Sequence, residues 1–176
     1  KLITKNTSAI LPVHVFGNAV RLEKLITICN KYNIKVIEDA AESLGTTYTA
    51  GKYKNKHCGT IGTLGCLSFN GNKIITTGGG GIILTNSKTL SEKAKYLINQ
   101  SKDDTINFIH NNIGYNYRLS NLHASLGLSQ LNKINVILNK KKFVYNTYRK
   151  LLENKTHYSL MNSPNFCDTN KWLNVL

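Results

Sequence analysis

The sequence predicts an α/β domain built on a parallel sheet, and three successive segments support this prediction. The apolar run "AILPVHVFG" at residues 9–17 is typical of a buried strand that ends in a turn. The segment "NAVRLEKLITICNKYN" at residues 18–33 places apolar residues on one helical face, with Asn18 as the expected N-cap. The run "IKVIED" is typical of a second strand. A strand, a helix and a strand in this order predict a βαβ unit, whose strands are parallel.

Further elements follow along the chain. Short strands are expected in "GCLSF" and "GIILT", on either side of a loop with one lysine and four consecutive glycines. A helix is expected in "TLSEKAKYLINQ", followed by a polar, exposed loop over residues 100–113. Ser120 can cap a long helix whose pattern predicts a break near Asn139. The closing run "NKWLNVL" predicts the first strand of another unit.

Length and composition limit the class of protein. The chain has 176 residues, of which 41% are hydrophobic, enough for the core of one domain. It begins without methionine and ends on an apolar run, so we expect an internal fragment of a longer protein. No apolar run approaches the roughly 18 residues of a membrane span, so no membrane partner is expected.

The formal charge of +14 raises the question of an anionic partner. The lysines are spread along the chain, and arginine occurs only at positions 21, 118 and 149, which argues against nucleic acid. The abundance of Asn and Ile indicates compositional drift, although a positive field can attract an anionic substrate. The four cysteines form no CxxC pair and no metal spacing with the five histidines, so we expect reduced thiols in a cytoplasmic protein and no metal.

Several polar residues follow the predicted strands, where ligands gather in an open parallel sheet. They are His14, Asp39, Ser68 and, shortly after, Lys73. Asp39 either caps a following helix or holds a cationic ring nitrogen, whose protonated form a carboxylate favours. On a helical first turn Glu42 shares that side.

The lysine loop reads "SFNGNKIITTGGGG" at residues 68–81. Its glycines follow Lys73, and a P-loop needs the opposite order, with Ser or Thr directly after the lysine. A desolvated lysine amine is a nucleophile that can form a Schiff base. With Ser68 as a phosphate donor and Asp39 as the ring partner, the residues describe a pyridoxal phosphate (PLP) site.

Four ordered motifs, "PVHVFG", "VIEDAAESLG", "GTIGTLGCLSFNGNKIITTGGGGIILTN" and "IGYNYRLSNLHASLGLSQL", cover nearly the whole chain. With them the sequence resembles the DegT/DnrJ/EryC1/StrS sugar aminotransferases. The resemblance implies PLP fold type I (aspartate aminotransferase-like), with a mixed, mostly parallel sheet and helices on both faces. It also implies that residues 1–154 are part of the PLP-binding large domain, that residues 155–176 start a C-terminal small domain, and that both ends are truncated.

The resemblance also assigns roles to individual residues. Lys73 is implied to bond covalently to the cofactor, Asp39 to face its pyridine nitrogen, Ser68 to contact its phosphate and Glu42 to lie beside its ring. Asn116 matches an asparagine that reaches the cofactor of a partner subunit, which implies a homodimer with shared sites. His14 and Arg118 lie in family motifs, where a structural role and a substrate role are both open.

The implied activity is transfer of an amino group from glutamate to a keto-deoxy nucleotide sugar. "EDAAESLG" with "SFNGNKIITTGGGG" is most similar to the branch that aminates 4-keto-6-deoxy sugars, including UDP-linked N-acetylated ones. The alternatives are a 3-keto-sugar aminotransferase, a dehydratase and a non-catalytic anion-binding protein. Dehydratases of the family carry His at the lysine position, so Lys73 argues against that activity. The family's N-terminal part and most of its small domain are missing, so we expect the fragment alone to be inactive.

Overall fold

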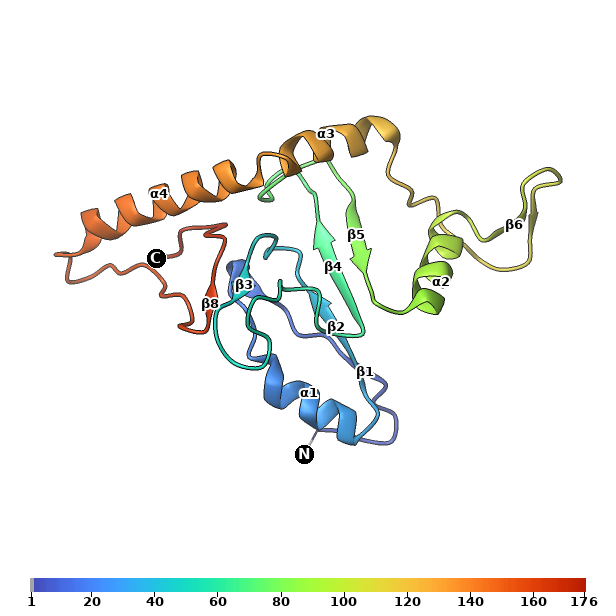
Figure 1. Cartoon of the computed structure of the whole chain (residues 1–176), viewed down its shortest axis with the longest axis horizontal. Coiled ribbons are helices and arrows are strands. Elements are labelled where there is room, and N and C mark those ends of the chain that lie inside the picture. The colour runs from blue at the N-terminus through green and yellow to red at the C-terminus, as the bar shows by residue number, and fades with distance from the viewer. Residues whose placement is uncertain (1) are drawn as a thin grey trace.

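A mixed four-stranded sheet forms the centre of the computed structural model, which describes residues 2–176 (Figure 1). The strand order is β1-β2-β4-β5, with β1, β2 and β4 parallel and β5 antiparallel to β4. The strands are β1 (Ala9–Ile10), β2 (Lys35–Asp39), β4 (Leu64–Ser68) and β5 (Gly81–Leu84). This arrangement confirms the predicted mixed, mostly parallel sheet.

Four α-helices and two small strand pairs surround this sheet. The helices are α1 (Leu22–Lys31), α2 (Lys88–Ile98), α3 (Asn121–Leu131) and α4 (Ile134–Leu152). The pairs join β3 (Thr47–Tyr48) to β8 (Cys167–Asp168) and β6 (Lys102–Asp104) to β7 (Ile109–His110). In Figure 1, α3 and α4 follow one another across the end of the molecule toward which β4 points.

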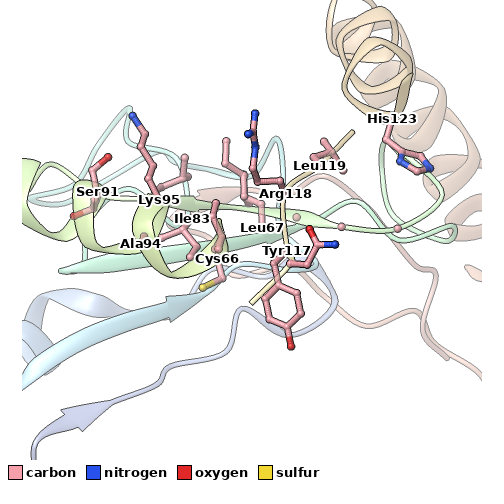
Figure 2. Close-up of a pocket in the computed structure, with 18 of the residues that line it drawn as sticks. Cys66, Leu67, Ile83, Ser91, Ala94, Lys95, Tyr117, Arg118, Leu119 and His123 are labelled. Atoms are coloured by element: carbon pink, nitrogen blue, oxygen red, sulfur yellow. The ribbon is translucent and has the colours of Figure 1, made fainter. Parts of the chain in front are cut away.

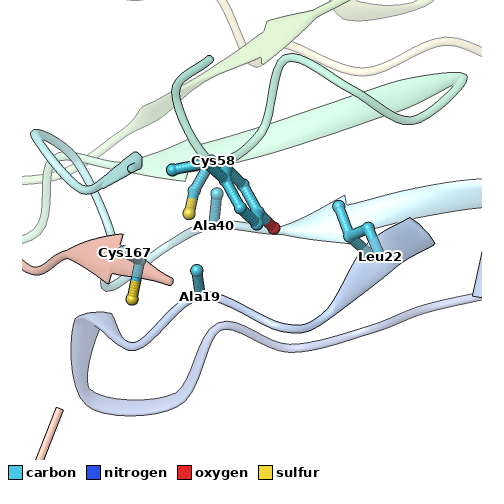
Figure 3. Close-up of a cluster of buried hydrophobic side chains, with 6 residues drawn as sticks. Ala19, Leu22, Ala40, Cys58 and Cys167 are labelled. Carbon is cyan, nitrogen blue, oxygen red and sulfur yellow. The ribbon is translucent and has the colours of Figure 1, made fainter. Parts of the chain in front are cut away.

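The main core lies between α1 and the sheet (Figure 3). Its buried members come from five separate segments of the chain, namely Ala19, Leu22, Ala40, Tyr48, Cys58 and Cys167. Leu22 is fully buried, and burying such a side chain stabilises the fold by about 2 kcal/mol. The Tyr48 hydroxyl donates to the Val20 carbonyl at 2.7 Å, and burial raises the pKa of the Cys58 thiol to about 12. Cys58 is therefore a packing residue and not a reactive thiol.

The strand predicted over residues 9–17 is much shorter than expected. Only Ala9–Ile10 pairs with β2, and both residues are exposed. The chain then makes one bridge, from Val13 to Asp39, and turns through the 3₁₀ helix η1 (Val15–Gly17). Asn18 does not cap α1, because its backbone N–H closes that turn on the Val15 carbonyl. The helix begins only at Leu22, without a side-chain cap.

Later segments include one confirmed cap and three corrections. Ser120 caps α3, accepting a hydrogen bond from the His123 N–H as predicted. The break predicted near Asn139 lies instead between α3 and α4, because Ile137 and Leu138 pack on a second core cluster and keep this turn helical. Residues 102–110 contain the β6–β7 hairpin where a plain loop was expected. The run "NKWLNVL" forms no strand, and the domain boundary at residue 154 stays a prediction.

Candidate functional site

Asp39 and Ser68 lie on one face of the sheet, at the carboxyl ends of β2 and β4. The register pairs Asp39 with Cys66, and side chains of directly opposed residues point to the same face. Ser68 lies two residues after Cys66 and therefore shares that face. Glu38 points to the opposite face, where it is fully buried. The ends of β2 and β4 thus present a carboxylate and a hydroxyl on the same face of the sheet.

The segment after β2 is a series of turns and not a helix. The backbone N–H of Ala41 donates to Asp39 Oδ1 at 3.1 Å, and the Ser43 N–H donates to the Ala40 carbonyl. Asp39 therefore closes an Asx turn, which corrects the alternative that it caps a helix. The helical turn expected to bring Glu42 to the same side is also absent, so the position of Glu42 depends on other contacts.

Glu42 and Lys73 meet beside the end of β2. Glu42 Oε2 accepts a hydrogen bond from the Phe16 backbone N–H at 2.6 Å, and Glu42 Oε1 lies 4.0 Å from Lys73 Nζ. The side chain of Lys73 is only 14% exposed. Its amine lies 4.3 Å from the centre of the Trp172 ring. The lysine singled out from the sequence is therefore largely enclosed, between a carboxylate and an aromatic face.

The loop that carries Lys73 has open space around its glycines. Ser68 Oγ accepts a hydrogen bond from the Asn70 N–H at 3.3 Å, which leaves the hydroxyl proton free to be donated. No atom lies within 4 Å of the position that a Cβ would take at Gly71, Gly78 or Gly79. Gly78 also has a φ of +80°, a conformation that favours glycine. These glycines therefore leave open space along the loop.

His14 is a structural residue in this geometry. Its ring is fully buried, Nδ1 accepts from the Val20 N–H at 3.0 Å, and Nε2 lies 3.0 Å from Glu38 Oε2. Because Nδ1 is an acceptor, Nε2 carries the proton and donates to Glu38. Both ring nitrogens are thus engaged, and the arrangement favours the structural alternative over a substrate contact.

Glu38, on β2, is hydrogen-bonded to the segment that carries His14 and to the loop at residues 59–62. Besides His14, its carboxylate accepts backbone hydrogen bonds from Gly59, Ile61 and Gly62. Burial by itself raises the pKa of Glu38, but the hydrogen bonds from His14 and these amides outweigh it, so the pKa lies below its ordinary value. Glu38 therefore holds the loops on either side of β2 in place as a carboxylate.

Asn116 and Arg118 lie in a different place, along an open groove of about 1080 Å³ (Figure 2). The groove runs between β5, α2 and the segment before α3, and its lining includes neither Asp39, Ser68 nor Lys73. Figure 2 shows the long side chains of Lys95 and Arg118 pointing to the same side of it. The groove is also lined by Cys66 and by Gly78–Gly81 of the Lys73 loop, so it borders this loop without including the side chains of Asp39, Ser68 and Lys73.

The residues around Lys73 fit PLP by their chemistry. The amine of Lys73 can bond to an aldehyde, the carboxylate of Asp39 can accept a ring N–H, and the hydroxyl of Ser68 can donate to a phosphate. In residues 2–176, no cluster of three His, Cys, Asp or Glu side chains is arranged to ligate a metal. Among the same residues, no helix combines the length and hydrophobicity needed to span a membrane.

Sequence reasoning missed two residues at this site, Trp172 and Asn170. Trp172 contacts Lys73, and Asn170 donates hydrogen bonds to the carbonyls of Glu42 and Leu44 at 2.8 and 2.9 Å. The available signal was weak: Trp172 is the only tryptophan of the chain. The contact of Trp172 with Lys73 was not predicted, because its run was interpreted as a strand.

Comparisons with known proteins agree with this geometry. The sequence profile of the DegT/DnrJ/EryC1/StrS aminotransferase family matches residues 1–175. The chain belongs to this family. PLP is the cofactor implied by the family, and the solved structures similar to this chain share the aminotransferase fold.

Individual relatives match along most of this chain. EpsN of Bacillus subtilis (strain 168), named for pyridoxal phosphate-dependent aminotransferase activity, is 38% identical over 96% of this chain and 42% of its own length. GDP-perosamine synthase of Escherichia coli O157:H7 is 38% identical over 84% of this chain and 39% of its own length. PseC of Helicobacter pylori, described as an aminotransferase involved in the biosynthesis of pseudoaminic acid, superposes with a TM-score of 0.88 at 28% identity, covering 98% of this chain and 46% of PseC. The family member thus spans less than half the length of these relatives.

Proposed function

We propose that the full-length protein is a PLP-dependent aminotransferase that moves an amino group from glutamate to a keto-deoxy nucleotide sugar. The proposed acceptor is a UDP-linked 4-keto-6-deoxy-N-acetylhexosamine, and the proposed role is surface glycan biosynthesis. The observation that carries the proposal is the enclosed Lys73 amine, 4.0 Å from Glu42 Oε1, on the loop that follows the strand end with Ser68. Family membership supports the reaction class.

Each residue has a separate task in this proposal. When bound, PLP supplies an electron sink for the charge that develops at the α-carbon of the donor. Lys73 Nζ takes the proton from that carbon and returns it during the transfer. The Asp39 carboxylate accepts the hydrogen bond of the ring nitrogen and keeps its proton in place. Ser68 donates to the phosphate, and Glu42 orients Lys73 next to the ring.

The proposal includes a homodimer, in which Asn116 of each subunit reaches the cofactor phosphate of its partner. Asn116 is exposed and lines a groove whose lining includes none of Asp39, Ser68 and Lys73, which supports this arrangement. The proposed location is the cytoplasm, supported by four free cysteines. The role of Arg118 is proposed as a contact to the nucleotide sugar, since a guanidinium suits a diphosphate.

The first test is cofactor binding by the full-length protein. We expect added PLP to produce the absorbance band of a lysine-bound cofactor, and borohydride reduction to fix the cofactor's mass to the protein. Lys73→Ala removes the nucleophile and is expected to lose both signals and all turnover, whereas Lys35→Ala, a distant exposed lysine, keeps them. Turnover retained by Lys73→Ala overturns the assignment.

The second test concerns the substrate. Purified protein, glutamate and a panel of keto-sugar nucleotides are incubated, and the products are read by mass. We expect amination of UDP-linked 4-keto-6-deoxy sugars. Amination of a GDP-linked sugar, as the name of the perosamine synthases implies for them, keeps the reaction and changes the acceptor. Amination of a 3-keto sugar supports the alternative aminotransferase of the same family.

A non-catalytic anion-binding protein is the candidate from a different class. The formal charge of +14 favours it. The enclosure of one lysine beside a carboxylate does not, because anion binding by a positive field needs exposed charge. A protein that takes up no PLP and binds polyanions in a strongly salt-dependent manner would support this candidate.

A further inference from the structure

Trp172 is attached to the Lys73 loop at two points. Its indole Nε1–H donates to the backbone carbonyl of Asn72 at 2.7 Å, and its ring centre lies 4.3 Å from Lys73 Nζ. The residue is only 5% exposed and packs with Ile74 and Ile75. The hydrogen bond fixes the indole relative to the residue that precedes Lys73, so the ring face has a defined position against the amine.

Asn170 holds the segment that carries Trp172. Its side-chain Nδ2 donates to the carbonyls of Glu42 and Leu44, while Oδ1 accepts from the Trp172 backbone N–H at 3.0 Å. Its own backbone N–H donates to Thr46 Oγ1 at 3.1 Å. Asn170 is 1% exposed, so these bonds are made away from water. One side chain therefore joins the Glu42 turn to Trp172.

Two neighbouring features show that this contact is built into the fold. A Cβ at Gly17 would lie 2.0 Å from Asn170 Oδ1, so the absence of a side chain at Gly17 allows the approach. The amine of Lys141, on α4, donates to the Trp172 carbonyl at 3.1 Å. The segment from 170 to 172 is thus held from three directions, by η1, by the Glu42 turn and by α4.

We propose that Trp172 is a positioning residue for Lys73, and that Asn170 keeps it in place. The aromatic face covers one side of the Lys73 amine and shields it from water. With Glu42 on another side, the ring restricts the amine to a small region next to the turn after β2. This proposal rests on the proposed function, because positioning matters only if the amine reacts. The alternative is that Trp172 only fills the core.

The test compares three variants of the full-length protein. Trp172→Phe keeps an aromatic face and loses the indole N–H, Trp172→Leu keeps an apolar side chain and loses the face, and Ile137→Ala removes volume from the same core cluster without touching Lys73. Apoprotein is mixed with PLP, and the rate of covalent capture is read by intact mass after borohydride reduction. Thermal unfolding is measured in parallel.

We expect Trp172→Leu, which lacks both the ring face and the indole N–H, to capture PLP about tenfold more slowly than the wild type, and Trp172→Phe, which lacks only the N–H, to capture it at a rate between the two. Ile137→Ala is expected to lower the melting temperature while its capture rate stays that of the wild type. The proposal is overturned if Trp172→Leu slows capture no more than Ile137→Ala, or if Trp172→Phe is as slow as Trp172→Leu. Failure of the proposed function looks different: the wild type itself then captures no PLP.

Discussion

The surroundings of Lys73 and of Asn116 differ in how completely this chain encloses them. Lys73 is contacted by Glu42 and Trp172, and its side chain is 14% exposed. Asn116 and Arg118 line an open groove, next to Tyr117 at 72% exposure and Leu122 at 79%. This chain by itself therefore positions the Lys73 amine, whereas it leaves Asn116 and Arg118 exposed along the groove.

The two regions also differ in the sign of their charged side chains. Asp39 ends β2, Glu42 lies 4.0 Å from Lys73 on the turn that follows, and Glu38 is buried on the opposite face of β2. The groove carries Lys95 and Arg118 and no carboxylate. The enclosed region is therefore suited to holding a protonated ring and an amine, and the open region is suited to an anionic group.

The largest expected effect comes from Asp39→Asn. The substitution keeps the shape and the Asx turn but removes the charge that holds the ring proton. An opposite charge at contact distance shifts a pKa by about 1 to 3 units, so we expect turnover to fall by about 10- to 10³-fold. Steady-state kinetics of the full-length protein measure this, with the PLP content checked by mass. Turnover within about threefold of the wild type would remove Asp39 from the site.

The second effect concerns the stability of the enclosed region. Glu38→Gln leaves His14 and three backbone amides without their carboxylate, and breaking such a buried arrangement costs about 3 kcal/mol of unfolding free energy. Urea unfolding measures the loss, with the exposed Glu92→Gln as a control that costs under about 0.5 kcal/mol.

The pH dependence of this loss has a definite sign. The pKa of Glu38 is lowered in the folded state from an ordinary value of 4.5, so the carboxylate stabilises the fold above that pH. The contribution is lost as the pH falls through 4.5 and then through the lower folded pKa. We expect the gap between wild type and Glu38→Gln to narrow as the pH falls from about 6 to about 3. A gap that is constant over this range contradicts the assignment.

A partial recovery of activity in mixed dimers tests whether the open region serves a second subunit. Lys73→Ala and Asn116→Asp are each expected to be inactive, the latter because a carboxylate repels the phosphate. If Asn116 acts across a dimer, mixing the two proteins under exchanging conditions makes half of the dimers mixed, each with one intact site of two. Activity should then return to about a quarter of the wild type.

A matched mixture provides the control for this experiment. Lys73→Ala mixed with Asp39→Asn has both changes in the enclosed region, so no mixed dimer contains an intact site. We expect this mixture to stay inactive. If the Lys73→Ala and Asn116→Asp mixture also stays inactive while subunits are shown to exchange, Asn116 serves its own subunit.

Local patterns predicted much of the fold correctly. The runs that became β2, β4 and β5 are short, apolar and bounded by turn residues, and the cap at Ser120 depends on contacts within one turn. Predictions failed where distant segments decide the structure. After Ile10 the chain leaves the sheet ladder and turns through η1, and the helix continues through Asn139 where Ile137 and Leu138 pack on the second core cluster.

The residues of the candidate site also divide into those that the sequence predicted and those that it did not. Asp39, Ser68 and Lys73 were predicted because strand ends and glycine-rich loops are visible in the sequence. Glu42 was predicted for a helical turn that does not form, and it reaches Lys73 through the contact with Phe16. The hydrogen bonds of the Asn170 side chain were not predicted, because no sequence pattern indicates a hydrogen bond between residues 128 positions apart.

Sequence patterns predicted the family, most of the order of the strands and helices, and the positions of Asp39 and Ser68 at strand ends and of Lys73 in the following loop. These follow from motifs, spacing and alternation, which are properties of neighbouring residues. The contact between Trp172 and Lys73 is visible only in the tertiary structure. The Trp172 indole hydrogen-bonds the carbonyl of Asn72, the residue before Lys73, which lies 100 positions earlier in the sequence. The physical reason is that such a contact depends on how the whole chain packs its core, and local preference carries no information about it.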